Sequence, residues 1–519
     1  MNMISRWESV CALEDIVPDT GVGALLGDRQ VAIFRVGDAI HVIGNHDPVS
    51  QANVLSRGIV GDLQGQIVVA SPIYKQHYSL VSGRCLEDPA LSVPVYLSRI
   101  EGGRVWVKTT PEKISLGTAR RKLVVIGNGM AAMKVIEDLL AVAPQAYEVT
   151  VFGAEPHGSY NRVLLSPVLS GEKRSEDIVT HSPEWFAEQG IVFHSGDPIE
   201  HIDRARRVVR SRRGIEQVYD RLLVATGSHA IVLPVPGKEL PGVVTFRDLA
   251  DVDSMLFAAR TQRRAVVIGG GLLGLEAANG LLKRGMEVSV VHLAGSLMER
   301  QLDEPAAALL QGELERRGIQ FFLKASTQAI LGSERVQGVQ LADGREIAAD
   351  LVVMAVGVRP NADLARAAGL RCDRGVLVDD TLLTYDPAVY AVGECVQHRN
   401  STYGLVAPLW EQAAVCAAHL AERGTARYPG SRLATQLKVS GIDVYSAGEF
   451  NVKEGRESLV MRDPKRGVYK RLVLENNRIR GAVLVGDTRD GRWYFDLINE
   501  QRDVGAWREQ LLFGEAHCT

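Results

Sequence analysis

The segment Arg121-Lys-Leu-Val-Val-Ile-Gly-Asn-Gly-Met-Ala-Ala132 decides the fold that we expect. Lys122 to Ile126 is a short apolar run typical of a buried parallel strand, and a helical pattern follows from Met130 to Ala143. A second strand is expected from Tyr147 to Phe152, with Glu155 just past its end. The order of strand, glycine turn, helix and strand predicts a dinucleotide-binding βαβ unit.

The residue types in this unit suit a bound nucleotide. Gly127 permits a tight turn, and Gly129 lets backbone N–H groups approach a pyrophosphate at the positive end of the helix. A carboxylate after the second strand can accept hydrogen bonds from ribose hydroxyls. The candidate nucleotide contacts of this unit are Gly127, Gly129, Met130, Ala131 and Glu155.

The same arrangement recurs downstream, with strands at Ala265–Ile268 and Glu287–Val291 on either side of a glycine turn and a helix at Leu275–Lys283. Two complete units in one chain indicate two nucleotides held at once, which fits a flavin and a nicotinamide. For Glu276 two interpretations stay open, a neighbour of the nicotinamide and a charge on the helix surface. The candidate contacts of the second unit are Gly269, Gly271, Leu272, Leu273, Gly274, Glu276 and His292.

The second unit departs from the usual NAD-binding pattern at one position. His292 follows the strand, where such units usually carry Asp or Glu to bind the ribose 2′-hydroxyl. The segment Leu293 to Ser296 has no Arg or Lys for the 2′-phosphate of NADPH, although a protonated His292 would serve a phosphate weakly. We therefore expect NADH.

Composition limits the remaining possibilities. A chain of 519 residues with 46% hydrophobic content has material for three or four domains. The net charge of −3 and the pI of about 6.5 give no electrostatic argument for nucleic acid or an anionic membrane. The amino terminus has no signal pattern, no apolar run has the length of a membrane span, and the six cysteines show no paired spacing. We expect a cytoplasmic protein.

Residues 1–110 read as an all-β domain, with strands expected at 30–36, 39–45, 65–70, 77–82 and 104–108. The stretches 53–58, 70–78 and 82–89 resemble a Rieske-type domain, most closely that of the small subunit of assimilatory NADH nitrite reductase. A Rieske cluster needs two Cys and two His ligands, but Ser71 and Tyr74 stand where the second pair should be, and His46 and His77 have no neighbouring thiolate. We expect no cluster here. The domain is either a docking or regulatory module or an appendage that only adds stability.

From residue 121 to about 500 the chain resembles the flavin-binding part of the large subunit of assimilatory NADH nitrite reductase and related nitrate reductase subunits. The stretches that carry the resemblance are 160–166, 297–303, 357–361, 391–395 and 403–408. The resemblance implies FAD in the outer unit and NADH in the inner one. It favours Arg162 and Ser166, in the loop after the second strand, as contacts of FAD. A compact turn at Thr226-Gly227 lets the backbone approach a second nucleotide, and Glu394 beside Gly393 is either a contact of the ribityl chain or a plain cap of its strand. Trp410 either shields the flavin ring or belongs to the core, and Gly357 is the last candidate.

The expected fold class is α/β, with two nested Rossmann-like units of the FAD-dependent pyridine nucleotide reductase type between an N-terminal β domain and a C-terminal α+β domain. A linker is expected at 109–120 and a closing helix at Ala506–Phe513. The expected domains are 1–110, 120–248 together with 374–432 for FAD, 249–373 for NADH, and 433–519.

Cysteine spacing narrows the expected activity. The chain has no Cys-x-x-Cys, which argues against an all-cysteine cluster, and no cysteine between Cys85 and Cys372, which argues against a disulfide reductase. We expect no metal site and no catalytic side chain, because the flavin does the chemistry. The expected function is an electron-entry subunit for a molybdenum and iron–sulfur nitrate reductase. A separate nitrite reductase, a small carrier such as rubredoxin or ferredoxin, and a flavin-based redox sensor are alternatives, and a homodimer is left open.

Overall fold

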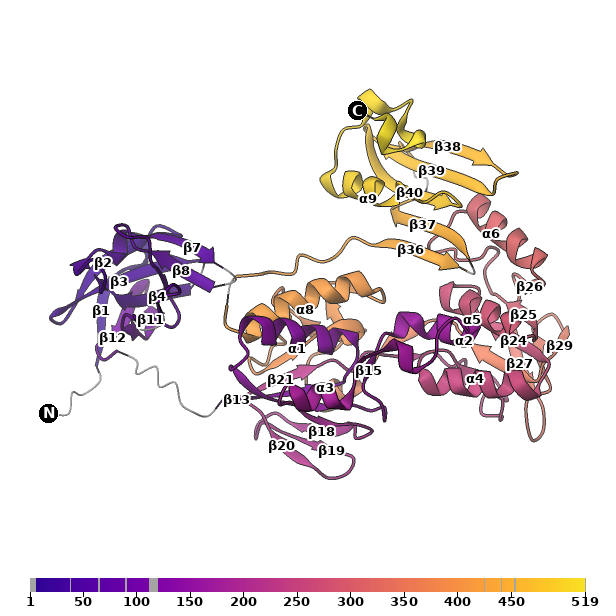
Figure 1. The fold of residues 1–519 in the computed structure, drawn as a ribbon, viewed down its shortest axis with the longest axis horizontal. Helices are drawn as coiled ribbons and strands as arrows, with labels where there is room; N and C mark the ends of the chain where they lie inside the picture. The colour runs from indigo at the N-terminus through magenta and orange to yellow at the C-terminus, as the bar shows by residue number, and fades with distance from the viewer. Residues whose placement is uncertain are drawn as a thin grey trace.

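The computed structural model describes residues 6–37, 39–63, 66–88, 91–111, 120–423, 425–439, 441–451 and 454–518. These residues form an N-terminal β domain, two nucleotide-binding units and a C-terminal sheet, so the expected fold class is confirmed (Figure 1). Most of the expected linker lies outside the described residues. Within them, we find no helix with the length and apolar character needed to cross a bilayer.

The N-terminal β domain consists of small antiparallel sheets. Its strands are β1 (Trp7–Ala12), β2 (Gly21–Leu26), β3 (Arg29–Val36), β4 (Ala39–Gly44), β5 (His46–Asp47), β6 (Ala52–Asn53), β7 (Ile59–Leu63), β8 (Gln66–Ala70), β9 (His77–Ser79), β10 (Val95–Tyr96), β11 (Ser98–Glu101) and β12 (Arg104–Lys108). The strands expected at 30–36, 39–45 and 104–108 are confirmed. Strands β2 and β7 were not anticipated, because glycines in both weaken the alternating apolar pattern.

The first nucleotide-binding unit is built on a parallel sheet with the order β17-β14-β13-β21-β33. Helices α1 (Met130–Val142) and α8 (Val406–Leu420) cover one face, and a meander of β18 (Ile199–Asp203), β19 (Val208–Ser211) and β20 (Glu216–Val218) covers the other. Because the strands are parallel, their carboxyl ends share one edge, and all the loops that follow them meet there. The strands are β13 (Arg121–Ile126), β14 (Tyr147–Phe152), β17 (Val192–His194), β21 (Arg221–Val224) and β33 (Val389–Ala391).

The second unit repeats this plan with the order β23-β30-β24-β25-β26. Helices α4 (Leu249–Thr261) and α5 (Leu272–Lys283) cover one face, and α2 (Leu165–Ser170), which belongs to the first unit by sequence, packs against α5. The opposite face is covered by β27 (Thr327–Leu331), β28 (Gly338–Leu341) and β29 (Glu346–Ala348). The sheet strands are β23 (Val243–Thr245), β24 (Arg264–Ile268), β25 (Glu287–Val291), β26 (Gln320–Phe322) and β30 (Leu351–Met354).

The chain passes between the two units through a two-stranded ribbon of β22 (Ser228–Ala230) and β31 (Val358–Pro360). Strand β23 belongs to the second sheet although it precedes Leu249. After the ribbon, Ala362 and Ala365 already pack in the core of the first unit. The second sheet therefore begins, and the first core resumes, earlier in the chain than the pattern of the sequence indicated.

The C-terminal sheet is antiparallel, with the order β36-β37-β40-β39-β38. Its strands are β36 (Ala434–Val439), β37 (Ile442–Gly448), β38 (Glu457–Asp463), β39 (Val468–Glu475) and β40 (Arg478–Val485). Helix α9 (Gly491–Glu500) packs on one face. The helix expected at Ala506–Phe513 is wrong: that stretch holds short 3₁₀ turns, whereas α9 buries Tyr494, Leu497 and Ile498 at helical spacing.

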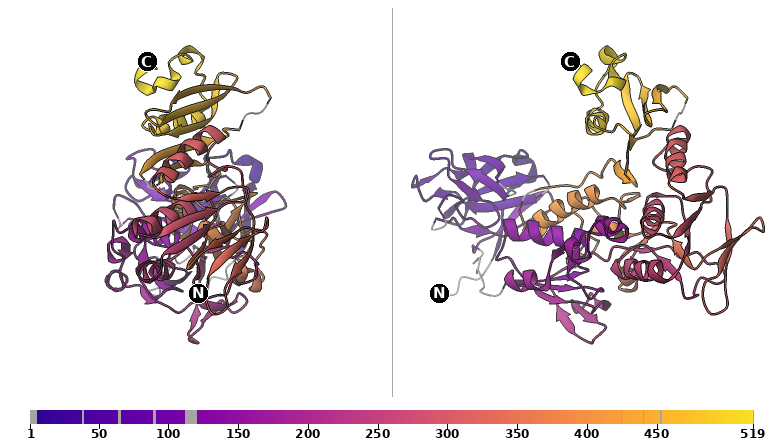
Figure 2. Two further views of the ribbon diagram at one scale, coloured as in Figure 1. Left: turned by 90° about the vertical axis from the view of Figure 1, so that its right-hand side faces the viewer. Right: turned by 45° about the vertical axis from the view of Figure 1, so that its right-hand side comes forward.

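The other face of the C-terminal sheet packs against the second unit, beside α6 (Glu304–Arg316), as both views of Figure 2 show. Asp303 joins the two. Its Oδ1 accepts a hydrogen bond from the Ala306 N–H and so caps α6, while its Oδ2 accepts from Tyr469 Oη and Arg471 Nη1, each at 2.6 Å. The C-terminal sheet is thus attached to the second unit through a largely buried carboxylate.

Candidate functional site

The first glycine turn has the geometry of a pyrophosphate cradle. Gly127 has φ +105°, and a Cβ there would lie 2.2 Å from the Ala225 carbonyl oxygen, so only glycine fits. Gly129 precedes α1 as its N-cap, and nothing lies within 4 Å of the position its Cβ would take. Met130 and Ala131 form the first turn of that helix. The open space at the positive end of a helix fits a phosphate group.

The second turn repeats these features. Gly269 has φ +123°, and its Cβ would lie 2.2 Å from the Ala355 carbonyl oxygen. Gly271 caps α5 and has nothing within 4 Å of its Cβ position, and a Cβ on Gly274 would meet the Gly269 carbonyl oxygen at 1.9 Å. Leu272 and Leu273 begin α5. Each unit therefore presents one open glycine at a helix N-terminus, so the residues present fit two dinucleotides.

Glu155 and Arg162 meet at the edge of the first sheet. The Arg162 guanidinium forms an ion pair with Glu155, and Tyr160 Oη donates a hydrogen bond to Glu155 at 2.6 Å. Arg162 also donates through Nη1 to the Arg247 carbonyl oxygen at 3.0 Å. This arginine thus links the acidic residue of the first unit to the chain that enters the second.

A second ion pair crosses the same junction. Glu394, which follows β33, pairs with Arg247 and accepts a hydrogen bond from Ser228 Oγ at 2.8 Å. Gly393 and Gly227 both have positive φ, +90° and +68°, and nothing lies within 4 Å of the Cβ position of Gly227. Sequence reasoning missed Arg247 and Ser228, because no local pattern signals a partner 147 or 166 residues away.

Ser166 and Glu276 connect the two units directly. Ser166 Oγ on α2 donates to Glu276 Oε2 on α5 at 2.5 Å. Burial raises the pKa of the Glu276 carboxyl, and the hydrogen bond from Ser166 offsets part of that effect. Glu276 is therefore a partly buried group at the junction, and its interpretation as a helix-surface charge is wrong.

His292 lies at the end of β25 with its ring turned into the protein. Its Nδ1 accepts a hydrogen bond from the Gly270 N–H at 3.0 Å, and its Nε2 lies 3.1 Å from Glu299 Oε2. The structure also places Lys324 beside the loop after His292. The Lys324 N–H donates to the Ala294 carbonyl oxygen at 3.0 Å.

The other residues predicted to contact a nucleotide do not join the polar contacts described above. Thr226 donates its hydroxyl to the Asn361 carbonyl oxygen at 2.6 Å, so this group serves the junction between β21 and the returning chain. Gly357, with φ +115°, lies just before β31. Trp410 lies on α8 with 36% of its surface exposed. Cys395, beside Glu394, is fully buried, and burial raises the pKa of its thiol.

In the N-terminal β domain, the buried residue Asp47 lies beside Ser71, which stands where a Rieske-type domain would carry a cluster ligand. Its carboxylate accepts hydrogen bonds from Ser71 Oγ at 2.6 Å, Ser50 Oγ at 2.9 Å, Tyr78 Oη at 3.0 Å and the Val49 N–H at 2.9 Å. Burial alone would raise its pKa, but these hydrogen bonds hold the pKa of Asp47 below its usual value.

One pair of possible cluster ligands is closer than the sequence indicated. His77 Nδ1 lies 2.5 Å from Glu87 Oε1, and Cys85 Sγ donates to Glu87 Oε2 at 3.3 Å. A Rieske cluster requires two thiolates and two imidazoles, and this carboxylate-bridged pair does not supply them. Across the described part of the chain, no group of three or more His, Cys, Asp and Glu side chains is placed to hold a metal ion. The residues present do not fit an iron–sulfur cluster.

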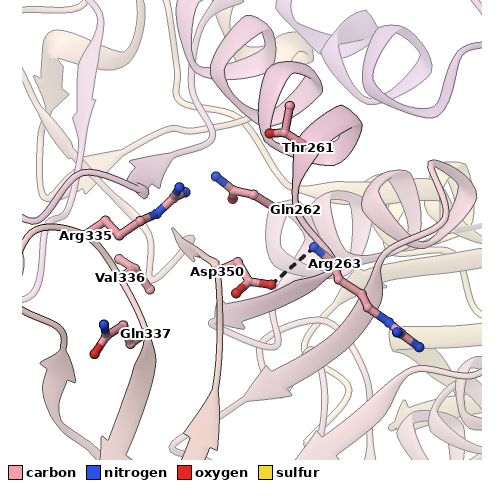
Figure 3. Close-up of a pocket in the computed structure, with 7 residues that line it drawn as sticks. All are labelled: Thr261, Gln262, Arg263, Arg335, Val336, Gln337 and Asp350. Atoms are coloured by element: carbon pink, nitrogen blue, oxygen red, sulfur yellow. Dashed lines mark hydrogen bonds between the residues drawn. The ribbon is translucent and has the colours of Figure 1, made fainter.

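A polar hollow of about 360 Å³ lies elsewhere in the second unit (Figure 3). Arg263 and Asp350 line it just before β24 and β30 begin, so it lies at the strand edge opposite the glycine turn. Its position excludes it from the nucleotide-binding edge. Its lining residues are Thr261, Gln262, Arg263, Arg335, Val336, Gln337 and Asp350.

Three family models match different parts of the chain. Residues 121–419 match pyridine nucleotide-disulphide oxidoreductase, residues 6–108 match the Rieske-like [2Fe-2S] domain, and residues 434–502 match the rubredoxin NAD+ reductase C-terminal domain. The first of these covers both nucleotide-binding units and more than half of the chain.

Relatives agree with this assignment. A nitrite reductase [NAD(P)H] of Bacillus subtilis is 48% identical over 74% of this chain and 48% of its own length. An assimilatory nitrate reductase electron transfer subunit of the same organism is 42% identical over 76% of this chain and 51% of its own length, so the chain spans about half of each relative.

Among solved structures, a covalent putidaredoxin reductase–putidaredoxin complex superposes with a TM-score of 0.68 at 26% identity, covering 76% of this chain and 96% of the other. The chain therefore belongs to the pyridine nucleotide-disulphide oxidoreductase family, whose members bind FAD and NAD(H).

Proposed function

We propose that this protein is an NADH-dependent FAD flavoprotein that passes electrons to a separate assimilatory nitrate reductase catalytic subunit. One observation carries the proposal: two open glycine cradles lie in one chain, in units joined by partly buried polar contacts. Such a pair serves to place two nucleotides against each other. The 42% identity to an assimilatory nitrate reductase electron transfer subunit supports the choice of partner.

In this proposal the protein binds and orients the two nucleotides and keeps water from the junction between them. Bound FAD would supply the two-electron acceptance and one-electron release that connect a nicotinamide to a metal centre. The first cradle, with Glu155, Arg162, Thr226, Gly227, Gly393, Glu394 and Trp410, would hold FAD. The second, with Gly269 to Gly274, Glu276, His292 and Gly357, would hold NADH, and Ser166 would position Glu276 between them.

The chain divides into four domains in this proposal. We assign 120–248 and 374–432 to the FAD domain and 249–373 to the NADH domain, except that β23 joins the NADH domain and the chain from Ala362 onward joins the FAD domain. We assign 433–519 to the C-terminal domain and 1–110 to a Rieske-like docking module. The partner would carry molybdenum and iron–sulfur centres, and the pair would work in the cytoplasm. A homodimer is compatible with this arrangement.

A small soluble carrier is the second candidate for the electron acceptor. The match of residues 434–502 to the rubredoxin NAD+ reductase C-terminal domain favours it. In this alternative the two cradles serve the same purpose, and only the docking surface for the acceptor differs.

Reconstitution distinguishes the two candidates. The full chain loaded with FAD is mixed with NADH and either a molybdenum nitrate reductase catalytic subunit or rubredoxin, and NADH oxidation is followed together with nitrite formed or rubredoxin reduced. Nitrite formation that requires both proteins supports the first candidate. Rapid rubredoxin reduction without nitrite formation contradicts it and supports the second. The variants Gly129→Ala and Gly271→Ala, which fill the two cradles, should abolish the reaction. Their matched control is Gly312→Ala, at an open glycine on α6 away from both cradles.

A further inference from the structure

The end of β25 is where a Rossmann-like unit normally places the carboxylate that binds the adenosine ribose. In this chain His292 occupies that position and is only 8% exposed. Because its Nδ1 accepts a hydrogen bond from the Gly270 N–H, the ring proton sits on Nε2. That Nε2–H faces Glu299 Oε2 at 3.1 Å. The histidine therefore does not replace the missing carboxylate but holds another one.

The loop after His292 brings Glu299 back to the glycine turn. The Met298 N–H donates to the Gly270 carbonyl oxygen at 3.0 Å, and the side chains of Leu297 and Met298 are buried beneath the loop. The Glu299 side chain, next in sequence, is 43% exposed. An anchored loop thus presents a solvent-accessible carboxylate beside the turn that would hold the pyrophosphate.

We propose that Glu299, oriented by His292, accepts the 2′-hydroxyl of the adenosine ribose and selects NADH over NADPH. This assignment rests on the proposed function and identifies the nucleotide that the second unit takes. A carboxylate at this place binds a hydroxyl donor and repels a 2′-phosphate, which carries negative charge. His292 is a positioning residue, because it acts through Glu299.

Lys324 makes the assignment testable in both directions. Its side chain lies against Gly295, with Cε 2.9 Å from the position a Gly295 Cβ would take, and it is exposed. Its ammonium is a cation beside the same loop. With Glu299 neutralised, this cation would favour a 2′-phosphate, so the loss of one carboxylate should shift the preference toward NADPH.

Binding is measured calorimetrically with NAD+ and NADP+ on the full chain loaded with FAD. In the unchanged protein we expect NAD+ to bind at least about tenfold more tightly than NADP+, as expected for one lost charge-assisted hydrogen bond plus repulsion. Glu299→Gln should weaken NAD+ binding about tenfold and bring the two affinities close together. Lys324→Met added to Glu299→Gln should then weaken NADP+ binding.

Two further variants separate a specific role from a structural one. Glu287→Gln, at the opposite end of β25 in an exposed ion pair with Arg263, should leave both affinities unchanged. His292→Asp combined with Glu299→Gln restores a carboxylate at the strand end and should restore the preference for NAD+. An NAD+ to NADP+ ratio that Glu299→Gln leaves within about twofold of the unchanged protein overturns the assignment.

The measurement is independent of electron transfer. If the unchanged protein prefers NAD+ and loses that preference in Glu299→Gln, the assignment stands even where NADH fails to reduce the bound flavin, which would contradict the proposed function alone. If the unchanged protein prefers NADP+, the assignment of Glu299 and the choice of NADH both fail, while NADPH-driven reduction of the flavin would still support electron transfer to a partner.

Discussion

Ser166 and Glu276 join the two nucleotide-binding units through a single hydrogen bond of 2.5 Å between Oγ and Oε2. Ser166 lies on a helix that belongs to the first unit by sequence and packs against α5 of the second. Glu276 lies on α5 itself, in the second turn after the open cradle at Gly271. The contact therefore fixes the helix that carries one cradle relative to the unit that carries the other.

Glu276→Gln should raise the thermal midpoint of the nucleotide-binding units at neutral pH. Burial raises the pKa of the Glu276 carboxyl in the folded state, so the ionised carboxylate lowers stability above that pKa. Below the pKa of the unfolded state, the carboxyl is protonated in both the folded and the unfolded protein, and this loss of stability disappears. The gain in free energy of unfolding should therefore be complete once the pH exceeds the raised pKa of the folded state and shrink as the pH falls toward the ordinary carboxyl value of about 4.3.

Calorimetric scans across that pH range check this expectation. Glu315→Gln, at an exposed position on α6, is the matched control and should show no such gain. A lower midpoint for Glu276→Gln at neutral pH would mean that the ionised carboxylate stabilises the junction.

Gly129→Ala should abolish tight FAD binding without unfolding the protein. An Ala methyl at this position meets no protein atom within 4 Å, so it fills only the space reserved for the pyrophosphate. We expect FAD affinity to fall about 10- to 100-fold, measured by flavin fluorescence, with an unchanged melting temperature of the flavin-free protein.

Gly271→Ala should do the same to NADH binding while FAD is retained. Gly127→Ala is the instructive contrast, because its methyl would lie 2.2 Å from the Ala225 carbonyl oxygen at φ +105°, and we expect it to destabilise the fold itself. Equal FAD affinity in Gly129→Ala and Gly312→Ala would show that the first cradle does not hold the cofactor.

Arg247→Met should destabilise the junction by about 2 kcal/mol. Among the described residues, it leaves the Ser228 hydroxyl as the one partner of the Glu394 carboxylate, whose side chain is 15% exposed. The loss of stability is measured by urea unfolding, with hydrogen exchange of the amides in β33 and the segment after it as the readout.

The matched change is Arg263→Met, which removes a well-exposed ion pair with Glu287 and should cost less than about 1 kcal/mol. Similar costs for Arg247→Met and Arg263→Met would mean that the Arg247–Glu394 pair is no more important than a surface pair.

The N-terminal β domain should lose stability in acid because of Asp47. Its pKa is lowered in the folded state, so its contribution is present above the ordinary value of about 3.9 and is lost as the pH falls through the folded pKa. Asp47→Asn should lower the free energy of unfolding by about 1–3 kcal/mol at neutral pH, because an amide cannot accept from all four donors. It should also remove most of this acid sensitivity, because an amide does not titrate.

Hydrogen exchange in β8 and β9 reports on this domain within the full chain. Asp28→Asn is the control, since its side chain is 96% exposed and should behave as the unchanged protein does. Unaltered acid sensitivity in Asp47→Asn would assign the effect to another carboxylate.

Local patterns predicted the elements that carry the nucleotide sites. Strands β14 and β25 have the bounds expected from their apolar runs, and both glycine turns precede helices as expected, because strand, turn and helix signals lie within a few residues of one another. Helix α9 was not anticipated, although Tyr494, Leu497 and Ile498 recur at the spacing of an amphipathic helix.

The contacts that join the units could not be read from the sequence. Arg247 reaches Glu394 across 147 residues, and Ser166 reaches Glu276 across 110 residues. The Asp47 network in the N-terminal β domain was likewise hidden, because its donors come from loops and strands up to 31 residues away. Long-range polar pairing has no periodic signature in the chain.

Asp303 caps the start of α6 and holds the C-terminal sheet with the same carboxylate. If the second unit rotates to bring the nicotinamide toward the isoalloxazine, the C-terminal sheet must move with it as one rigid body. The bending would fall on the paired strands β22 and β31, through which the chain passes between the two nucleotide-binding units.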